Sequence, residues 1–161
     1  MIDATYIKRL LKTRHPDKAW IYATEVPTKT GYSSPHDNGL GGMRVIDAFA
    51  MSVWPSKEYK RVAYEIKVTR SDWLAELSEP TKRAQAWYLA DQLYFVLGPG
   101  VGDERDLPRD ARRCGIIQVS KQGEIADVGH CLGHDAWPMP AWFVASFLRC
   151  ARDQQRTDKA I

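Results

Sequence analysis

The sequence predicts an α/β fold in which a mixed central sheet is flanked by helices. The chain has 161 residues, which suits one domain that buries roughly 70% of the surface its unfolded form exposes. Within about the first 97 residues, the local patterns follow one another as helix, three strands, helix and strand. Two more strand patterns and a last helix follow. We therefore expect a single α/β domain.

The expected core begins with an amphipathic helix over residues 3–14, where apolar residues recur at helical spacing after an N-cap at Asp3. The segment from Trp20 to Val26 is rich in aromatic and β-branched residues, and this composition predicts the first strand. Residues 27–42 hold glycine, serine and proline with few apolar anchors. They predict a long, mobile loop of a kind that is often functional.

Two apolar runs, about 43–53 and 61–68, predict the second and third strands, joined by a turn around Pro55 and Ser56. Ser71 then offers the N-cap of a helix that begins with the sequence DWLAEL. A proline at position 80 restarts this helix as far as residue 90. The run QLYFVL predicts the fourth strand, and the sequence GPG ends it.

The remainder of the chain predicts an extension of this core. CGIIQVS and GEIADV read as a pair of strands, and a helix over residues 140–153 covers the core. The polar tail 154–161 is expected to be frayed. The domain thus spans residues 1–161, with a core over about 3–97 and a C-terminal extension over 98–153.

Composition limits the environment and the partners. The net charge is +3 and the pI is about 8.8, which permits an anionic partner without demanding one. Three cysteines form no disulfide framework, and the N-terminus lacks the apolar segment of a signal peptide. No apolar run approaches the ~20 residues of a membrane-spanning helix. We therefore expect a cytoplasmic protein with reduced thiols and no membrane partner.

Charged residues inside the two apolar runs indicate where the chemistry lies. Asp47 is in the first run, and Glu65 and Lys67 are in the second. Alternation along a strand places Glu65 and Lys67 on one face and Ile66 on the other. If the two strands pair, Asp47 approaches Glu65, and two carboxylates that close repel each other unless a cation or a shared proton lies between them. The sequence therefore proposes a divalent metal.

The donor types select the metal and the chemistry. Asp47 and Glu65 supply hard oxygen ligands, which suit Mg²⁺ or Mn²⁺ better than zinc, and the backbone carbonyl of Ile66 is a plausible further ligand. A metal of this kind activates water and stabilises charge on a phosphoryl oxygen. Lys67 would orient that water or neutralise the transition state. These are the parts that phosphodiester hydrolysis requires.

Weaker alternatives accompany this hypothesis. A bare glutamate and lysine two residues apart are usually a salt-bridged pair on a solvent-facing strand. His130, Cys131 and His134 resemble half of a zinc site, but the second pair of ligands is missing, which favours a loop with incidental histidines. A catalytic role for Lys67 is favoured over a surface salt bridge only because Asp47 lies in the preceding strand and the elements follow the expected order.

These residues and this order resemble the PD-(D/E)XK nucleases. The αβββαβ order with D-x(17)-E-I-K matches the pattern of that superfamily, except that Ile46 stands where the strict motif has proline. The segments RVIDAFAM, YEIKVTRSDWLAEL, QLYFVLGPG and LPRDARRCGIIQV, with Pro80 and Lys82, are similar to MmcB-like DNA repair proteins and related phage nucleases. The likeness spans about residues 20–120.

The resemblance implies a restriction-endonuclease-like core and Mg²⁺-dependent cleavage of DNA. Under it, Asp47 and Glu65 are metal ligands and Lys67 is the catalytic lysine. Glu25, at the end of the first strand, is the candidate for a further acidic ligand, with an ordinary strand-end carboxylate as the alternative. The residues expected to contact nucleic acid are Arg44, Arg70, Lys82 and Gln85.

Two functions remain open from the sequence, beside a third reading in which the domain is purely structural and binds no metal. The first is a metal-dependent nuclease, with DNA as the partner and RNA as a further candidate. The second is a non-catalytic module of the same fold that binds nucleic acid or a repair partner. The sequence does not decide the strandedness of the substrate, nor whether the chain forms a homodimer.

Overall fold

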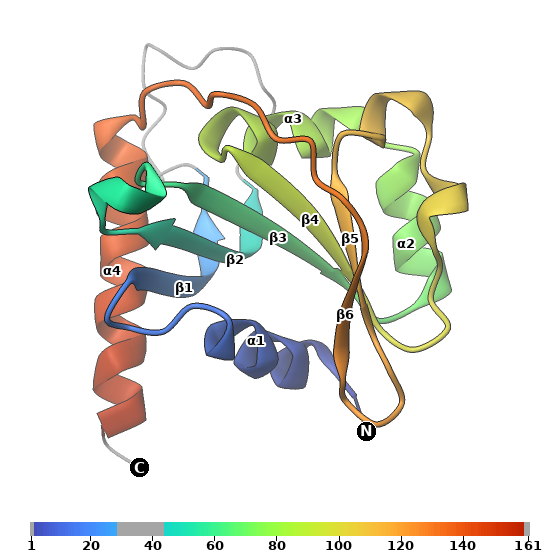
Figure 1. Ribbon diagram of the computed structural model, residues 1–161, viewed down its shortest axis with the longest axis horizontal. Coiled ribbons are helices and arrows are strands. Elements are labelled where there is room, and N and C mark those ends of the chain that lie inside the picture. The colour runs from blue at the N-terminus through green and yellow to red at the C-terminus, as the bar shows by residue number, and fades with distance from the viewer. Residues whose placement is uncertain (1, 29–43, 160–161) are drawn as a thin grey trace.

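A six-stranded mixed sheet and four α-helices form the fold of residues 2–28 and 44–159, which are the residues that the computed structural model describes (Figure 1). The helices are α1 (Ala4–Thr13), α2 (Arg70–Leu77), α3 (Pro80–Leu89) and α4 (Ala141–Lys159). The strands are β1 (Trp20–Pro27), β2 (Val45–Ser52), β3 (Arg61–Lys67), β4 (Gln92–Leu97), β5 (Gly115–Val119) and β6 (Ile125–Gly129). The predicted α/β class is confirmed.

The six strands lie in the sheet in their chain order, β1 to β6. The pairs β1–β2, β2–β3 and β5–β6 are antiparallel, whereas β3–β4 and β4–β5 are parallel. The β3–β4 pair is parallel because α2 and α3 return the chain to the starting edge of β3 before β4 begins, and residues 98–114 make the corresponding return between β4 and β5. The predicted mixed sheet, including the two strands of the C-terminal extension, is therefore present.

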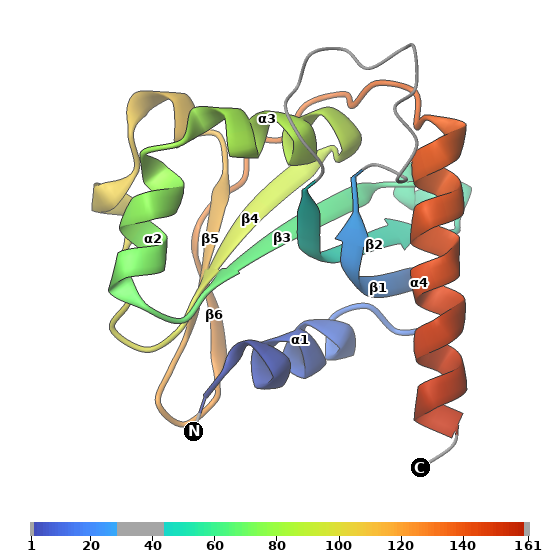
Figure 2. The same cartoon turned by 180° about the vertical axis from the view of Figure 1, so that it is seen from behind.

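Helices cover both faces of this sheet (Figure 2). Ile7 and Leu11 of α1 pack with Tyr64 and Ile66 of β3 on one face. Trp73 of α2 belongs to the core on the other face, which α2, α3 and α4 cover. Successive side chains of β3 therefore point into two different cores, and any charged residue on this strand faces a helix layer on one side or the other.

The start of α1 is as predicted, but the N-cap of α2 is not. The Asp3 carboxylate accepts the backbone N–H of Tyr6 at 2.7 Å. At α2, however, the hydroxyl of Thr69 accepts the N–H of Asp72 at 3.2 Å, and the helix already includes Ser71. Serine and threonine are both good N-cap residues. Thr69 is the N-cap because its backbone is extended, as an N-cap requires, whereas Ser71 already lies within the helix.

The prediction of a frayed tail over residues 154–161 is wrong as far as Lys159, because α4 continues to that residue. Gln154 makes hydrogen bonds to both the backbone N–H and the hydroxyl of Thr24 in β1. Asp158 accepts a hydrogen bond from Lys12 of α1 at 2.6 Å. These contacts to distant elements order a sequence that is polar on its own.

The long loop expected over residues 27–42 lies almost entirely outside the described residues. Pro27 still belongs to β1, and Thr28 is buried and its backbone N–H donates to the backbone carbonyl of Arg44 at 2.7 Å. Thr28 and Arg44 thereby bring the two described ends of this segment together. Within the residues that the structure describes, no helix is both long and apolar enough to span a bilayer.

Candidate active site

The site begins where the pairing of β2 and β3 ends. Ala48 and Tyr64 are the last register partners at this end of the pair, so Asp47 and Glu65 are the next residues on each strand. A carboxylate oxygen of Asp47, Oδ2, accepts the backbone N–H of Ile66 at 2.7 Å. The side chain of Asp47 thus reaches across to β3, as the pairing of the two runs predicted.

Alternation along β3 then separates its side chains. Tyr64 and Ile66 lie in the core beneath α1, whereas Ala63 lies in the core on the opposite face. Glu65 and Lys67 share that opposite face with Ala63 and point toward α2 and α3. The predicted common face of Glu65 and Lys67 is confirmed.

A pocket with a volume of about 330 Å³ opens between β2, β3 and the helices α2 and α3. Three of its polar residues are the predicted catalytic set, Asp47, Glu65 and Lys67. Its remaining polar lining residues are Thr28, Arg44, Glu76, Lys82 and Gln85. Most of the predicted site residues are therefore brought together, although they come from separate parts of the chain.

Lys67 is held between two carboxylates. Its Nζ atom lies 3.1 Å from Oε2 of Glu76 and 3.6 Å from Oε2 of Glu65. The side chains of Lys67 and Glu65 are only 14% and 16% exposed. The alternative of a solvent-facing ion pair is therefore wrong, because both partners face the helix layer instead of bulk water.

Glu76 is the pocket residue that sequence reasoning missed. It is 4% exposed, and it lies one helical turn after Trp73, which is fully buried. The i, i+3 spacing from Trp73 was the available signal, since it places both residues on the inward face of α2. A buried carboxylate at that position requires a partner, and Lys67 supplies it.

Arg83 fixes the end of α2 that carries Glu76. Its guanidinium, which is 6% exposed, donates to the backbone carbonyl of Glu76 at 2.8 Å. It also forms an ion pair with Asp110. The buried Arg83 thereby satisfies a carbonyl at the C-terminus of α2 and holds Glu76 above Lys67.

Burial controls the ionisation of the acidic pair. Burial and, after it, the neighbouring Asp47 together raise the pKa of Glu65 to about 8, although Lys67 acts in the opposite direction. Burial also raises the pKa of Asp47, against the hydrogen bond from Ile66 and the charge of Lys67. For Lys67, burial lowers the pKa, but Glu65 and Glu76 outweigh it and the net direction is upward. The site thus places three carboxyl groups around one ammonium, and Glu65 keeps its proton at neutral pH.

The donor set fits a hard divalent cation. Among residues 2–28 and 44–159, no three His, Cys, Asp or Glu side chains form a group that could hold a metal ion. Mg²⁺ does not need such a group, because it typically binds one or two carboxylates and keeps several waters. Asp47 and Glu65, on the wall of a solvent-accessible pocket, meet that requirement.

Glu25 lies beside this pair but is engaged elsewhere. The register of β1 and β2 brings it opposite Asp47, between the pairs Thr24–Ala48 and Val26–Ile46. Its side chain is 60% exposed and forms an ion pair with Lys8 of α1. Its φ angle of 52° lies in the left-handed region, which is uncommon for a residue other than glycine. Glu25 is therefore outside the pocket, although its charge raises the pKa of Asp47.

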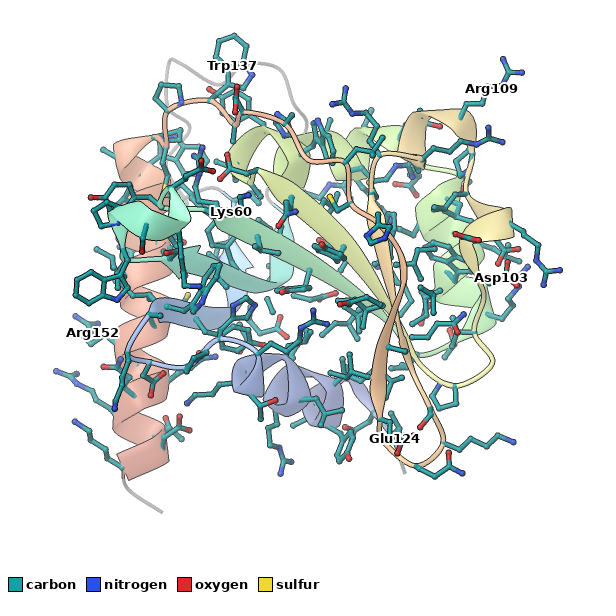
Figure 3. The ribbon with its side chains drawn as sticks, in the orientation of Figure 1. Lys60, Asp103, Arg109, Glu124, Trp137 and Arg152 are labelled. Atoms are coloured by element: carbon teal, nitrogen blue, oxygen red, sulfur yellow. The ribbon has the colours of Figure 1, made fainter. Side chains whose placement is uncertain are left out.

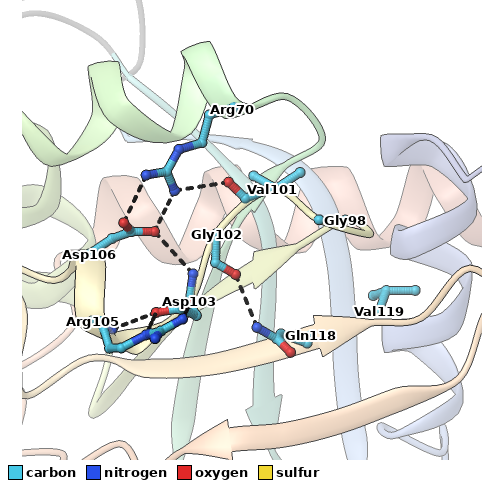
Figure 4. A pocket seen from close by; sticks show the side chains of 10 residues that line it. Arg70, Gly98, Val101, Gly102, Asp103, Arg105, Asp106, Gln118 and Val119 are labelled. Atoms are coloured by element: carbon cyan, nitrogen blue, oxygen red, sulfur yellow. Dashed lines mark hydrogen bonds and ion pairs between the residues drawn. The ribbon is translucent and has the colours of Figure 1, made fainter.

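Arg70 is not brought to the site either. Its guanidinium forms two hydrogen bonds to the carboxylate of Asp106 and one to the carbonyl of Val101 (Figure 4). These residues line a separate pocket of about 570 Å³ beside the loop that follows β4. Arg105 in that pocket is paired with Asp103 in the same way. Arg70 thus ties the start of α2 to this loop, and its expected contact with nucleic acid gains no support.

Arg44, Lys82 and Gln85 do line the site pocket. Lys82 forms an ion pair with Glu79 at 3.3 Å, and its side chain is 28% exposed. The Oε1 atom of Gln85 accepts a hydrogen bond from the hydroxyl of Thr28 at 2.7 Å. Two cationic side chains thus stand at the pocket that holds the acidic pair.

The cluster of His130, Cys131 and His134 forms no metal site in the described part of the chain. The ring of His134 stacks on Trp87, and its Nε2 atom lies 2.7 Å from the backbone carbonyl of Trp87. His134 therefore has a structural role in packing a loop against α3.

Comparison with protein-family models, with curated protein sequences and with solved structures finds no match.

Proposed function

We propose that the protein is a metal-dependent nuclease that hydrolyses DNA phosphodiester bonds, with the arrangement of a PD-(D/E)XK nuclease. The observation that carries this proposal is Lys67, held 3.6 Å from Glu65 in a pocket that Asp47 also lines. A base and two carboxylates on adjoining strands are the parts that the resemblance implies.

The electrostatics of the pocket support a bound cation. Glu65 keeps its proton up to about pH 8 because burial and Asp47 disfavour its charge. A divalent cation would displace that proton and relieve the repulsion between the two carboxylates. Asp47 and Glu65 would hold the cation, with the carbonyl of Ile66 as a further proposed ligand. A bound Mg²⁺ supplies Lewis-acid activation of water and of the phosphodiester.

The side chains of the protein would do the remaining work. Lys67, whose ammonium is fixed by Glu76, would stabilise negative charge that develops on the phosphoryl group. Arg44 and Lys82 would bind the flanking phosphates at the rim of the pocket. Glu76 would keep Lys67 in place through their ion pair.

The topology also supports the proposed arrangement. The antiparallel strands β1, β2 and β3 are followed by two helices and by the parallel strand β4. This order agrees with the αβββαβ core that the resemblance implies. Under this proposal the protein acts in the cytoplasm, where its three cysteines stay reduced.

The proposal is tested by cleavage of labelled DNA, single-stranded and duplex, with and without Mg²⁺. We expect Lys67→Met and Asp47→Asn to lose Mg²⁺-dependent cleavage while their circular dichroism spectra match the wild type. Lys121→Met, at the exposed turn between β5 and β6, is the control and should cut normally. Undiminished cleavage by both site variants would reject the assignment. Mg²⁺-independent DNA binding without cleavage would favour a binding module, and an RNA strand in the same assay tests the wider substrate class.

A further inference from the structure

Residues 130–140 form a strap that connects β6 to α4 without any helix or strand of its own. In Figure 1 it is the orange segment that passes α3 on its way to α4. A segment this long without regular structure normally moves freely, unless other elements hold its backbone. The strap is held at several points, and it carries the exposed side chain of Trp137.

Three hydrogen bonds from the sheet side hold the strap. The backbone N–H of His134 donates to the carbonyl of Asp91 at 3.0 Å, and that of Ala136 donates to the Asp91 carboxylate at 3.0 Å. The guanidinium of Arg61 donates to the carbonyl of Trp137 at 2.8 Å. Arg61 and Asp91 are themselves paired. The backbone of Trp137 is therefore fixed by contacts that do not involve its indole ring.

Two rings of the strap stack on two rings of α3. His134 lies on Trp87 with a centroid distance of 4.4 Å and an interplanar angle of 19°. Trp137 lies beside Tyr88 with a centroid distance of 6.0 Å and an angle of 20°. Trp137 is nevertheless 63% exposed, and Figure 3 shows it projecting from the edge of the molecule. One large aromatic ring is thus held in a set orientation while much of its surface remains open to solvent.

Helix α3 links this ring to the site pocket. Lys82 and Gln85 on α3 line the pocket, and Tyr88 is three residues beyond Gln85 on the same helix. Residues at this spacing are neighbours on a helix surface, about 5 to 6 Å apart between Cβ atoms. A strand that leaves the pocket along α3 would therefore reach Tyr88 and Trp137 next.

We propose that Trp137 is a stacking platform for an unpaired nucleobase, so that the site acts on a single-stranded segment. The inference deepens the proposed nuclease function and rests on it. Only an unpaired strand can place the face of a base on a protein ring, because the faces in a duplex are covered by neighbouring base pairs. A ring that is already oriented loses little conformational freedom on binding.

The test is fluorescence anisotropy of a labelled oligothymidylate and of a labelled duplex, both in EDTA so that no cleavage contributes. We expect Trp137→Ala to bind the single strand about tenfold more weakly than the wild type, with little change for the duplex. Trp137→Phe keeps an aromatic face and should retain most of the affinity. Trp54→Ala removes another exposed tryptophan, 53% exposed before the turn at Pro55, and should bind as the wild type does.

Unchanged single-strand affinity in Trp137→Ala would overturn the platform. The same conclusion would follow if sedimentation showed that the wild type dimerises and that Trp137→Ala does not, since the ring would then cover a second copy. The platform and the nuclease proposal are separable. If binding of the single strand depends on Trp137 but no Mg²⁺-dependent cleavage occurs, the nuclease proposal is rejected and the platform is kept. If cleavage is normal but binding does not depend on Trp137, the platform is rejected and the nuclease proposal is kept.

Discussion

The ammonium group of Lys67 lies 3.1 Å from the carboxylate of Glu76, a residue of α2 that is almost completely buried. This contact connects β3, the strand that carries Glu65 and Lys67, to the helix layer above it. It also divides the attraction of Lys67 between Glu76 and Glu65, which is 3.6 Å away. The balance between these two contacts determines how strongly Lys67 competes with a cation for Glu65.

Replacing Glu76 by glutamine should therefore weaken the response to Mg²⁺. The neutral amide attracts Lys67 less, so the ammonium would shift toward Glu65 and compete with the cation there. We expect the Mg²⁺ concentration for half-maximal cleavage to rise about tenfold, which corresponds to losing one charge-assisted hydrogen bond. Initial cleavage rates at a series of Mg²⁺ concentrations measure this half-maximal concentration. Glu104→Gln, on the exposed turn η2 (Glu104–Asp106), is the control. An unchanged Mg²⁺ dependence with a lower maximal rate would contradict this role.

Glu65 should destabilise the folded protein at alkaline pH when no divalent cation is present. Its pKa is raised from 4.5 to about 8 by burial and then by Asp47. Between these values the folded state binds more protons than the unfolded state, so the free energy of unfolding falls as pH rises through this window. We expect Glu65→Gln to exceed the wild type in stability by about 2 kcal/mol at pH 8.5, and by much less at pH 5.

Urea unfolding in EDTA at the two pH values measures this difference. Glu124→Gln, at the exposed turn labelled in Figure 3, should show no such dependence. Adding Mg²⁺ should stabilise the wild type at pH 8.5 and have little effect on Glu65→Gln, because a ligand of the folded state stabilises it by mass action. An equal gain at pH 5 and pH 8.5 would mean that the charge of Glu65 is not the cause.

Arg83 should matter for stability far more than its exposed neighbours. It is a buried cation that satisfies the carbonyl of Glu76 and pairs with Asp110. We expect Arg83→Met to reduce the free energy of unfolding by about 3 kcal/mol, as the loss of one partner from a buried network does. Arg109→Met, whose side chain points away from the molecule in Figure 3, should remain within about 0.5 kcal/mol of the wild type. Equal unfolding midpoints for the two variants would show that Arg83 does not hold α2.

His15 should make the fold sensitive to acid. Its ring is buried, with Nε2 at 2.7 Å from the Tyr64 hydroxyl and no partner for Nδ1 among the described residues. Burial lowers its pKa from 6.5 to about 4, so the folded state remains neutral where the unfolded state is protonated. Stability is therefore lost as pH falls from 6.5 toward 4.

We expect the unfolding free energy of the wild type to fall by about 2 kcal/mol relative to His15→Phe between pH 7 and pH 4. The phenylalanine keeps an aromatic ring next to Trp20 and Tyr22 but cannot titrate. Chemical unfolding of both proteins over this pH range makes the comparison. Parallel pH profiles would show that His15 does not contribute to the acid sensitivity.

Local patterns were sufficient to predict the strands and the meeting of Asp47, Glu65 and Lys67 in one pocket. The period of two along β3 placed Glu65 and Lys67 on one face, and the apolar runs placed β2 beside β3. Both conclusions depend only on neighbouring residues and on short connections, which a sequence displays directly. The same reasoning predicted the mixed α/β class.

Features that depend on distant contacts were not predictable. Glu76 enters the site only because α2 packs on β3, and the end of α4 is ordered by Thr24 and Lys12 from the other end of the chain. Arg70 was expected to contact nucleic acid because it lies in a segment that carries the resemblance, but its side chain turns to Asp106 instead. In each case a tertiary partner, absent from the local pattern, decided the outcome.

Binding of a cation by Asp47 and Glu65 is tested most directly by titrating the metal-free protein with Mn²⁺ and following the electron paramagnetic resonance signal of the free ion. We expect the wild type to bind Mn²⁺ at a single site, and Asp47→Asn and Glu65→Gln each to lose that binding. Equal Mn²⁺ binding by the wild type and both variants, or none by the wild type at pH 8.5, would contradict the claim that Asp47 and Glu65 hold the catalytic cation.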